Sequence, residues 1–403
     1  MRSIFCLLFA GLIFSSVVWA QSADTKVAAD AVNQLSISLY KQLNQKDGNL
    51  FFSPYSISGA LAMTYAGAQT DTAKEMAKVL FFPAEQKPLH ESFAALNDGL
   101  EAIKSKGAVE INVANSLWAE QSFNFKDDFL NLTKEYYKSE LNKVDFKTKS
   151  DFVAGAINAW VEQKTNNRIK DLIAPGILND LTRLVLVNAI YFKGKWQEEF
   201  SKEATKSQPF YTNASDSVPV DLMHRKGDFK YAEDDVCKTL EIPYKGNDLS
   251  MVIFLPQEKD GLKTLESIFT YEYVSLFQMQ MSSQKVEVFL PKFKLESASM
   301  LADTLKTMGM TLAFDANSAD FSGMANLTPD QKLYISQVIH KAFVDVNEEG
   351  AEAAAATAVM VEVGYAGPAS GSKVFRADHP FIFLIKDNKS GAILFLGRYV
   401  KPE

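Results

Sequence analysis

The alternation of side chains along residues 351–363 most constrains what this chain can fold into. The run AEAAAATAVMVEV is rich in alanine, which is the strongest helix former. However, Glu352 and Glu362 both occupy even positions, whereas every odd position holds Ala, Thr or Val. This period of two places all the charge on one face, as in a strand with one buried side. The segment therefore has the pattern of a strand about 43 Å long, although alanine and the glycines that follow give it little local preference for that structure.

The first 20 residues are typical of a cleaved signal peptide. Arg2 is their only charged residue, an apolar run covers residues 4–13, and the last three residues are Val-Trp-Ala, ending at Ala20. This segment is too short and too poorly flanked to favour a membrane span. We therefore expect an exported protein, secreted or periplasmic, with a mature chain of residues 21–403 and no membrane partner.

The composition argues against a nucleic-acid partner and against internal disulfides. The formal net charge is −7, or −8 once Arg2 is removed, and no basic stripe is visible. Cys6 leaves with the signal peptide, so Cys237 is the only cysteine of the mature chain. Stability must therefore come from the core, which a chain of this length can supply.

Sequence signatures of enzymes are missing. There is no nucleophile elbow, phosphate-binding loop, C-x-x-C or dinucleotide fingerprint. His90 and Glu91 begin an H-E-x-x-H pattern, but position 94 is alanine, so a zinc pair cannot form there. We expect no catalytic residue, no metal and no cofactor, with an extracellular hydrolase as a remote alternative.

The first part of the chain has the patterns of helices. Apolar residues spaced by three and four along residues 28–43 indicate an amphipathic helix. Ser53 followed by proline is a start signal for a second helix. Thr72 and Glu75 have the spacing of a capping box for a third helix over residues 73–80. A further helix is expected within residues 152–173.

Strand patterns dominate the rest of the chain. Three long ones fit a single large sheet, and they cover residues 109–119, 184–196 and 333–346. Two hairpins are also expected, one within residues 240–256 and one made by 381–385 and 392–400. With no linker or repeat in view, this order of elements favours one α+β domain over repeated βαβ units.

Several segments together, in the same order, resemble motifs of the serpin family: NLFFSPYSI at 49–57, VNAIYFKGKW at 187–196, LPKFKLES at 290–297, ADFSGM at 319–324 and VIHKAFVDVNEEG at 338–350. The resemblance implies three β-sheets, about nine helices and an exposed reactive-centre loop, here about residues 350–374. Serpins present this loop to a protease and, once it is cut, insert it as a new central strand of their largest sheet. The alternation along residues 351–363 suits such an insertion.

The resemblance also implies the roles of individual residues. The polar cluster beneath the point where the central strands part, called the shutter, would consist of Ser53, Ser56, Asn188 and His340. His340 is then a satisfied core histidine and not a catalytic one. The upper opening of the sheet, called the breach, would contain Trp196, Lys292 and Glu348, with an ion pair between the last two. The hinge of the loop would comprise Glu348, Gly350, Ala351, Ala353, Ala355 and Thr357.

The same resemblance places the bond that is cut. A count of 17 residues that starts at Glu348 ends at Gly364, with Tyr365 after the scissile bond and a cut after Val363 as the alternative. Cleavage after Val363 or Gly364 would suit an elastase-like pocket, and cleavage after Tyr365 a chymotrypsin-like one. No Lys or Arg occurs in residues 351–372, which disfavours trypsin-like targets.

We therefore expect a monomeric, irreversible suicide-substrate inhibitor of a serine protease with elastase-like or chymotrypsin-like specificity, with a cysteine protease as another possible target. The main alternative is a non-inhibitory serpin that acts as a carrier, storage protein or chaperone. Residues 350–358 favour inhibition because they contain no proline and no bulky side chain. Two departures from the family pattern are Ala351, where Thr or Ser is commoner, and the Gly-rich segment AGPASGSKV after the cut.

Overall fold

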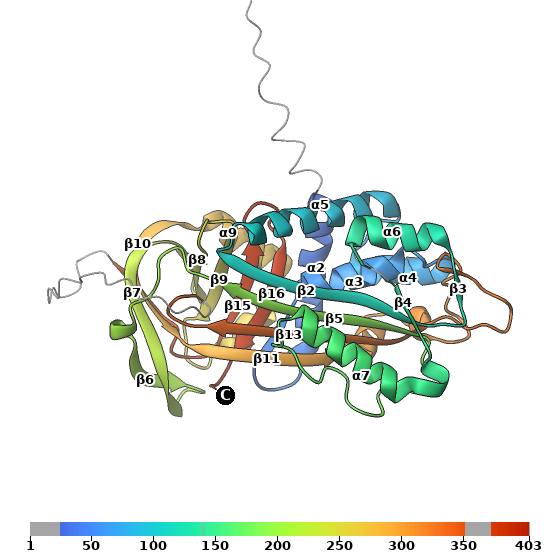
Figure 1. The fold of residues 1–403 in the computed structure, drawn as a ribbon. Helices are drawn as coiled ribbons and strands as arrows, with labels where there is room; N and C mark the ends of the chain where they lie inside the picture. Colours follow the sequence, from blue (N-terminus) through green and yellow to red (C-terminus); the bar gives the residue numbers. More distant parts are fainter. Residues whose placement is uncertain (1–24, 140, 351–371, 403) are drawn as a thin grey trace, which may run out of the picture.

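The computed structural model describes residues 25–139, 141–350 and 372–402 (Figure 1). Within them, the element order is mixed α and β, with helices concentrated early and hairpins late. The described residues form three sheets and nine α-helices. The predicted α+β class is therefore confirmed.

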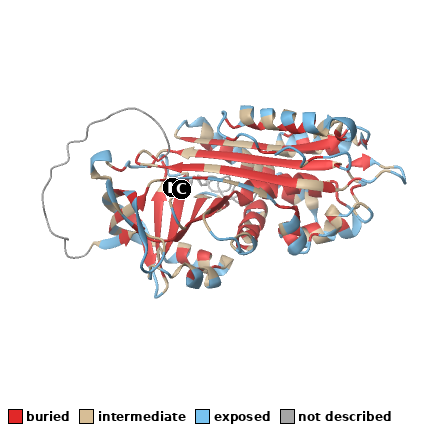
Figure 2. Ribbon diagram, turned by 90° about the horizontal axis from the view of Figure 1, so that it is seen from below, coloured by how far each residue is buried: buried red, intermediate tan, exposed pale blue. Residues whose placement is uncertain are grey.

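A five-stranded sheet runs along the molecule in the order β11-β13-β5-β2-β4 (Figure 1). Its strands are β2 (Val109–Glu120), β4 (Leu141–Val144), β5 (Leu184–Gly194), β11 (Phe293–Met300) and β13 (Ile335–Val346). The three predicted long strands are thus neighbours, as β2, β5 and β13. β5 and β13 are parallel to each other, whereas β2 and β11 pair with them in the antiparallel sense. Figure 2 shows that these central strands are largely buried.

A larger sheet has the order β1-β16-β15-β9-β8-β7-β10-β14, with β6 paired to β7. Its strands are β1 (Leu50–Phe52), β6 (Lys206–Tyr211), β7 (Ser217–Glu233), β8 (Cys237–Pro243), β9 (Leu249–Pro256), β10 (Ser282–Pro291), β14 (Lys373–Arg376), β15 (Phe381–Asp387) and β16 (Ile393–Tyr399). Both predicted hairpins are present in it, as β8–β9 and β15–β16. The third sheet pairs β3 (Asn124–Phe125) with β12 (Ala325–Asn326).

Helices lie on both faces of the five-stranded sheet (Figure 1). The helices of the described residues are α2 (Lys26–Leu43), α3 (Pro54–Tyr65), α4 (Thr70–Leu80), α5 (Gln86–Ser105), α6 (Asp127–Tyr137), α7 (Phe146–Lys164), α8 (Leu262–Ile268), α9 (Tyr271–Gln280) and α10 (Ala302–Thr307). α7 packs on one face of the sheet, where Ile157 and Val161 join Val185 and Val187 of β5 in a buried apolar cluster. α3 lies against the opposite face, in contact with β2 and β5.

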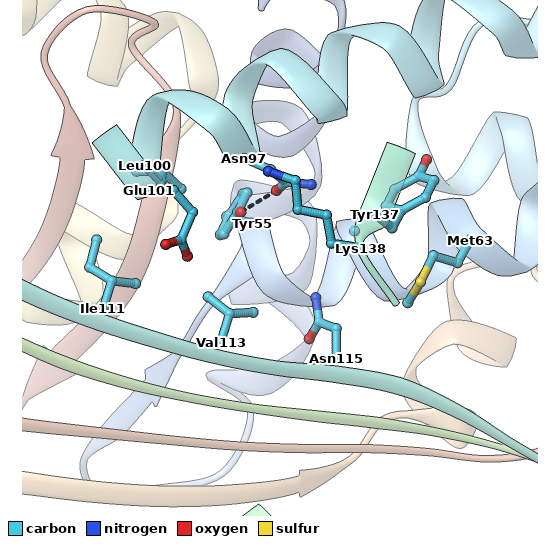
Figure 3. A pocket seen from close by; sticks show the side chains of 11 residues that line it. Tyr55, Met63, Asn97, Leu100, Glu101, Ile111, Val113, Asn115, Tyr137 and Lys138 are labelled. Carbon is cyan, nitrogen blue, oxygen red and sulfur yellow. Dashed lines mark hydrogen bonds between the residues drawn. The ribbon is translucent and has the colours of Figure 1, made fainter. Parts of the chain in front are cut away.

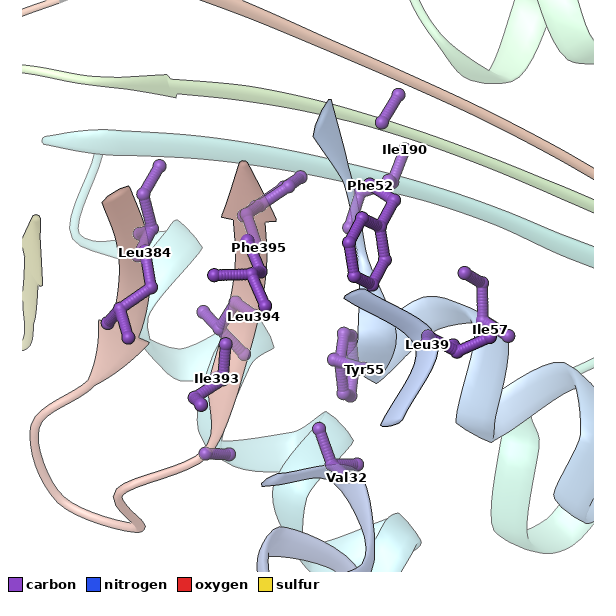
Figure 4. Close-up of a cluster of buried hydrophobic side chains, with 14 of the residues drawn as sticks. Val32, Leu39, Phe52, Tyr55, Ile57, Ile190, Leu384, Ile393, Leu394 and Phe395 are labelled. Atoms are coloured by element: carbon purple, nitrogen blue, oxygen red, sulfur yellow. The ribbon is translucent and has the colours of Figure 1, made fainter. Parts of the chain in front are cut away.

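α3 is buried along its whole length, which fixes the position of its first turn. The Ser53 hydroxyl caps it by accepting the N–H of Ser56 at 3.1 Å, and Pro54 occupies the first helical position, as predicted. All twelve residues of the helix are buried. In Figure 4, side chains from this region, among them Tyr55 and Ile57, lie in a cluster between α2 and β16. The polar groups at the start of α3 are therefore held rigidly beneath the sheet.

Two helix predictions were wrong in detail. Thr72 and Glu75 do not form a capping box, because α4 already begins at Thr70. The Glu75 carboxylate instead accepts the N–H groups of Thr311 and Leu312, each at 2.8 Å. The helix expected within residues 152–173 spans Phe146–Lys164, because Asp145 caps its start and Asn166 and Asn167 adopt positive φ beyond its end.

Candidate functional site

A row of polar side chains crosses the middle of the five-stranded sheet. Asn115 of β2 pairs in register with Asn188 of β5, and Asn188 pairs with His340 of β13. Asn188 and His340 are fully buried. Buried polar groups of this kind destabilise the folded protein unless each forms a hydrogen bond. The hydrogen-bond partners of these side chains therefore indicate the role of the row.

His340 links β13 both to α3 and to β5. Its Nε2 accepts the backbone N–H of Ser53 at 3.1 Å, so the ring proton resides on Nδ1, which donates to Oδ1 of Asn188. Burial lowers the pKa of His340 to about 3, so the ring is neutral near pH 7. A neutral imidazole with both nitrogens engaged is the satisfied core histidine that the sequence predicted.

The remaining shutter residues complete one connected network. The Asn188 amide group donates to the Ser56 hydroxyl and to Oδ1 of Asn115, and the Ser56 hydroxyl donates to the same Asn115 oxygen at 2.9 Å. The Ser53 hydroxyl donates to the carbonyl of Leu394 at 2.6 Å. The structure thus brings together all four residues that the sequence grouped as the shutter.

Asn115 belongs to this network but was missed from the sequence. A signal for it was present, because Asn115 falls on the face of the strand that otherwise carries Val109, Ile111, Val113 and Leu117. A lone amide on an apolar face needs a partner inside the core. The structure supplies partners in α3 and β5.

A cavity of about 220 Å³ reaches this network from the helical side (Figure 3). It lies between β2 and helices α3, α5 and α6, and Asn115, Val113 and Met63 are among its lining residues. Asn115 therefore has its oxygen in the shutter network and part of its surface on the cavity. Among the described residues, no group of three His, Cys, Asp or Glu side chains is placed to hold a metal ion.

The predicted ion pair of the breach is confirmed. Nζ of Lys292 lies 3.1 Å from Oε1 of Glu348, whose side chain is almost fully buried. Burial acts to raise the pKa of Glu348, but hydrogen bonds from its own N–H, Lys292 and Thr205 outweigh it and hold that pKa below its usual value. Glu348 is therefore ionised near neutral pH and is held from two sides.

Trp196 contacts the chain directly after β13. Its ring is buried and stacks on Tyr244 with the ring centroids 4.6 Å apart. Its indole N–H donates to the carbonyl of Asn347 at 2.9 Å. Trp196, Lys292 and Glu348 thus meet where β13 ends, which is where the sequence placed the breach.

Gly350 makes the turn at the end of β13 possible. Its N–H donates to the carbonyl of Asn347 at 3.1 Å, and its φ of +115° is one that residues with a side chain rarely adopt. A Cβ atom at this position would lie 2.2 Å from the carbonyl oxygen of Gly194. Of the predicted hinge residues, Ala351, Ala353, Ala355 and Thr357 lie outside the described residues, as do Val363, Gly364 and Tyr365 of the expected scissile bond.

The sequence matches one protein family and several of its curated members. A family model described as Serpin (serine protease inhibitor) matches residues 30–402. The leukocyte elastase inhibitor of Bos taurus is 43% identical over 382 residues, which cover 92% of this chain and 98% of that protein. An uncharacterized serpin-like protein of Methanosarcina mazei is 38% identical and covers 98% of this chain and 96% of its own length.

Solved structures agree with these relatives in fold. Uncleaved ovalbumin superposes with a TM-score of 0.84 and 35% identity, over 94% of this chain and all of that one. Serpin48 of the insect Tenebrio molitor gives a TM-score of 0.81 and 35% identity, over 93% and 98% of the two chains. With these matches and the sheet arrangement described above, the chain belongs to the serpin family.

Proposed function

We propose that this protein is a suicide-substrate inhibitor of a serine protease and works by inserting its cut loop between β5 and β13. One observation carries the proposal: β5 and β13 are parallel neighbours, and β13 leads directly into the turn at residues 347–350. A segment that reverses direction after β13 and enters between the two strands would run antiparallel to both and complete two regular ladders. The alternation along residues 351–363 gives that segment one uncharged face to bury.

The chemistry would begin as ordinary proteolysis. The serine of the protease attacks the reactive-centre carbonyl and forms an acyl-enzyme, which separates the loop from the chain that follows it. Insertion of the freed loop then carries the attached protease along the sheet. Catalytic geometry tolerates displacements of only about 1 Å, so a distorted protease cannot complete deacylation.

Elastase-like proteases are the proposed targets. The expected cut after Val363 or Gly364 places a small residue before the scissile bond, whereas a cut after Tyr365 would favour a chymotrypsin-like protease. Support comes from curated relatives named leukocyte elastase inhibitor in horse, cattle and Xenopus tropicalis, which are 41–43% identical. A cysteine protease is the alternative target.

Incubation with pancreatic elastase, chymotrypsin, trypsin and papain, followed by a denaturing gel, tests the proposal. We expect a covalent complex that survives denaturation with elastase or chymotrypsin. A loop that is cut by every protease without forming a complex would instead favour a carrier, storage or chaperone role. Mass spectrometry of the released C-terminal peptide locates the cut, and a site outside residues 362–366 would contradict the assignment of the reactive centre.

Export as a monomer is also part of the proposal. The support is the signal-peptide pattern of residues 1–20, with cleavage expected near Ala20. N-terminal sequencing of the protein recovered outside the cytoplasm should begin near Gln21, and size-exclusion chromatography should give the mass of one chain. Within the described residues, no helix has the length and apolar character needed to cross a membrane.

A further inference from the structure

Residues 195–205, here called the strap, follow β5 in the chain and form hydrogen bonds to the turn after β13. The strap starts immediately after β5, which ends at Gly194. Its backbone N–H groups at Trp196 and Phe200 donate to the carbonyls of Glu349 and Glu348, at 2.9 and 2.8 Å. These two carbonyls belong to the turn that follows β13. The strap therefore closes the β5–β13 junction at the end where an inserting strand would have to start.

Two side chains of the strap also contact the turn after β13. The Thr205 hydroxyl donates to Oε1 of Glu348 at 3.0 Å, a contact that shares its acceptor with the Lys292 ion pair. Nζ of Lys202 lies 2.6 Å from Oε1 of Glu349. The side chain of Glu349 is 14% exposed and that of Lys202 is 66% exposed, so the ion pair sits at the surface edge of the turn.

We propose that Lys202 is a positioning residue for release of the hinge: its ion pair with Glu349 holds the strap on the turn and slows insertion of the loop. This inference rests on the proposed function, because it concerns the step that follows cleavage. Insertion requires the chain at 347–350 to leave its present turn, so the bonds from the strap must break before or during that step. Lys202 and Glu349 are 147 positions apart in sequence, so the fold brings their side chains together.

The strap is anchored independently of Lys202. The Gln197 N–H donates to the carbonyl of Pro243 at 2.9 Å, and the Trp196 ring stacks on Tyr244. Glu198 is held by Arg225, whose guanidinium also donates to the Glu198 carbonyl at 2.8 Å. Loss of the Lys202 side chain therefore leaves the strap in place and changes only its hold on the turn.

Annealing of a synthetic peptide with the sequence of residues 351–363 to the uncut protein tests this role, with the rate followed by the band shift on a native gel. We expect Lys202→Ala to anneal the peptide about two- to fivefold faster than the wild type, as suits a surface ion pair. Lys202→Glu should be faster still because it faces Glu349. The exchange variant Lys202→Glu/Glu349→Lys should return toward the wild-type rate. Lys206→Ala removes an exposed lysine just beyond the strap and should leave the rate unchanged.

Hydrogen exchange at the Trp196 and Phe200 amides gives a readout that does not depend on inhibition. Both amides should exchange faster in Lys202→Glu, with an unchanged midpoint of thermal unfolding. Rates and exchange in Lys202→Ala and Lys202→Glu that equal those of Lys206→Ala would overturn the role of Lys202. A wild-type protein that neither anneals the peptide nor traps a protease would refute the proposed function, and amide exchange would still decide whether Lys202 holds the strap.

Discussion

Asn188 and His340 face each other across the junction of β5 and β13 and share a buried hydrogen bond from Nδ1–H to Oδ1. Neighbouring strands lie about 4.8 Å apart, so a strand placed between these two would move the side chains beyond hydrogen-bonding reach. The bond can therefore exist only while the junction is closed. It marks the closed state of the sheet at its centre, far from the turn at 347–350.

His340→Ala should destabilise the closed protein by about 2–4 kcal/mol, because it leaves the Ser53 N–H and the Asn188 oxygen without their partner and opens a void. Urea unfolding measures this loss, and heat-induced polymerisation should become faster. His224→Ala serves as the control, since His224 is partly exposed and contacts Glu287 at the surface. An equal loss of stability in the two variants would contradict the role given to the buried network.

Acidification should destabilise the protein through two buried histidines, His340 and His90, because burial lowers the pKa of each, to about 3 and about 4. The pKa of His340 is about 3 in the folded state, compared with 6.5 for an ordinary histidine, so the unfolded chain binds the additional proton between these values. Stability from this group is complete above about pH 6.5 and is lost as the pH falls towards 3, by roughly 5 kcal/mol in total. Unfolding free energies measured from pH 7 to 4 should fall less steeply in His340→Ala than in the wild type. Parallel curves would show that another group sets the acid sensitivity.

Gly350→Ala should destabilise the closed protein by about 1–3 kcal/mol, because the turn requires a positive φ and the new Cβ would meet backbone atoms of the strap. Gly59→Ala is the matched control, since Gly59 lies inside α3 and a Cβ there would lie 3.5 Å from the Asn115 amide nitrogen, an ordinary contact. This second change should stabilise the protein by up to about 1 kcal/mol through helix propensity. Chemical unfolding of both variants checks the difference in sign.

Ala351→Arg should convert the inhibitor into a substrate. On the face assignment made from the sequence, residue 351 turns inward on insertion, so arginine there would bury a charge without a partner, at a cost of several kcal/mol. The loop should then be cut at a normal rate while the protease is released active, without a denaturant-stable complex on the gel.

The neighbouring position supplies the control for this experiment. Glu352 belongs to the outward face, so Glu352→Arg should leave inhibition largely intact. Equal loss of inhibition in the two variants would refute the face assignment, and full inhibition by Ala351→Arg would refute the insertion mechanism.

Much of the fold follows from local patterns in the sequence. Long strand patterns predicted β2, β5 and β13, and the serine and proline before Tyr55 predicted the start of α3. These predictions succeed because the start of a helix and the pattern of a strand are set by residues close together in the sequence. The membership of Ser53, Ser56, Asn188 and His340 in one network came from the family resemblance, since spacing alone does not bring them together.

The sequence failed where a side chain serves a distant segment. Glu75 has the spacing of a helix cap, but its carboxylate holds the backbone at Thr311 and Leu312, over 230 positions away. The contact of Lys202 with Glu349 likewise depends on how the strap folds over the end of β13. Local spacing carries no information about such partners, so only the three-dimensional arrangement could identify them.

The parallel pairing of β5 and β13 has a further consequence for how this protein behaves as its concentration changes. Under the proposed function, a position between them would accept any strand of suitable alternation and opposite direction, and a second molecule carries the same segment as the first. The protein's own segment follows Gly350 in the same chain, so the effective concentration of that segment at the position would not depend on the protein concentration. A dilute solution would therefore favour self-insertion, whereas a high concentration of the protein would favour the competing linkage of one molecule to the next.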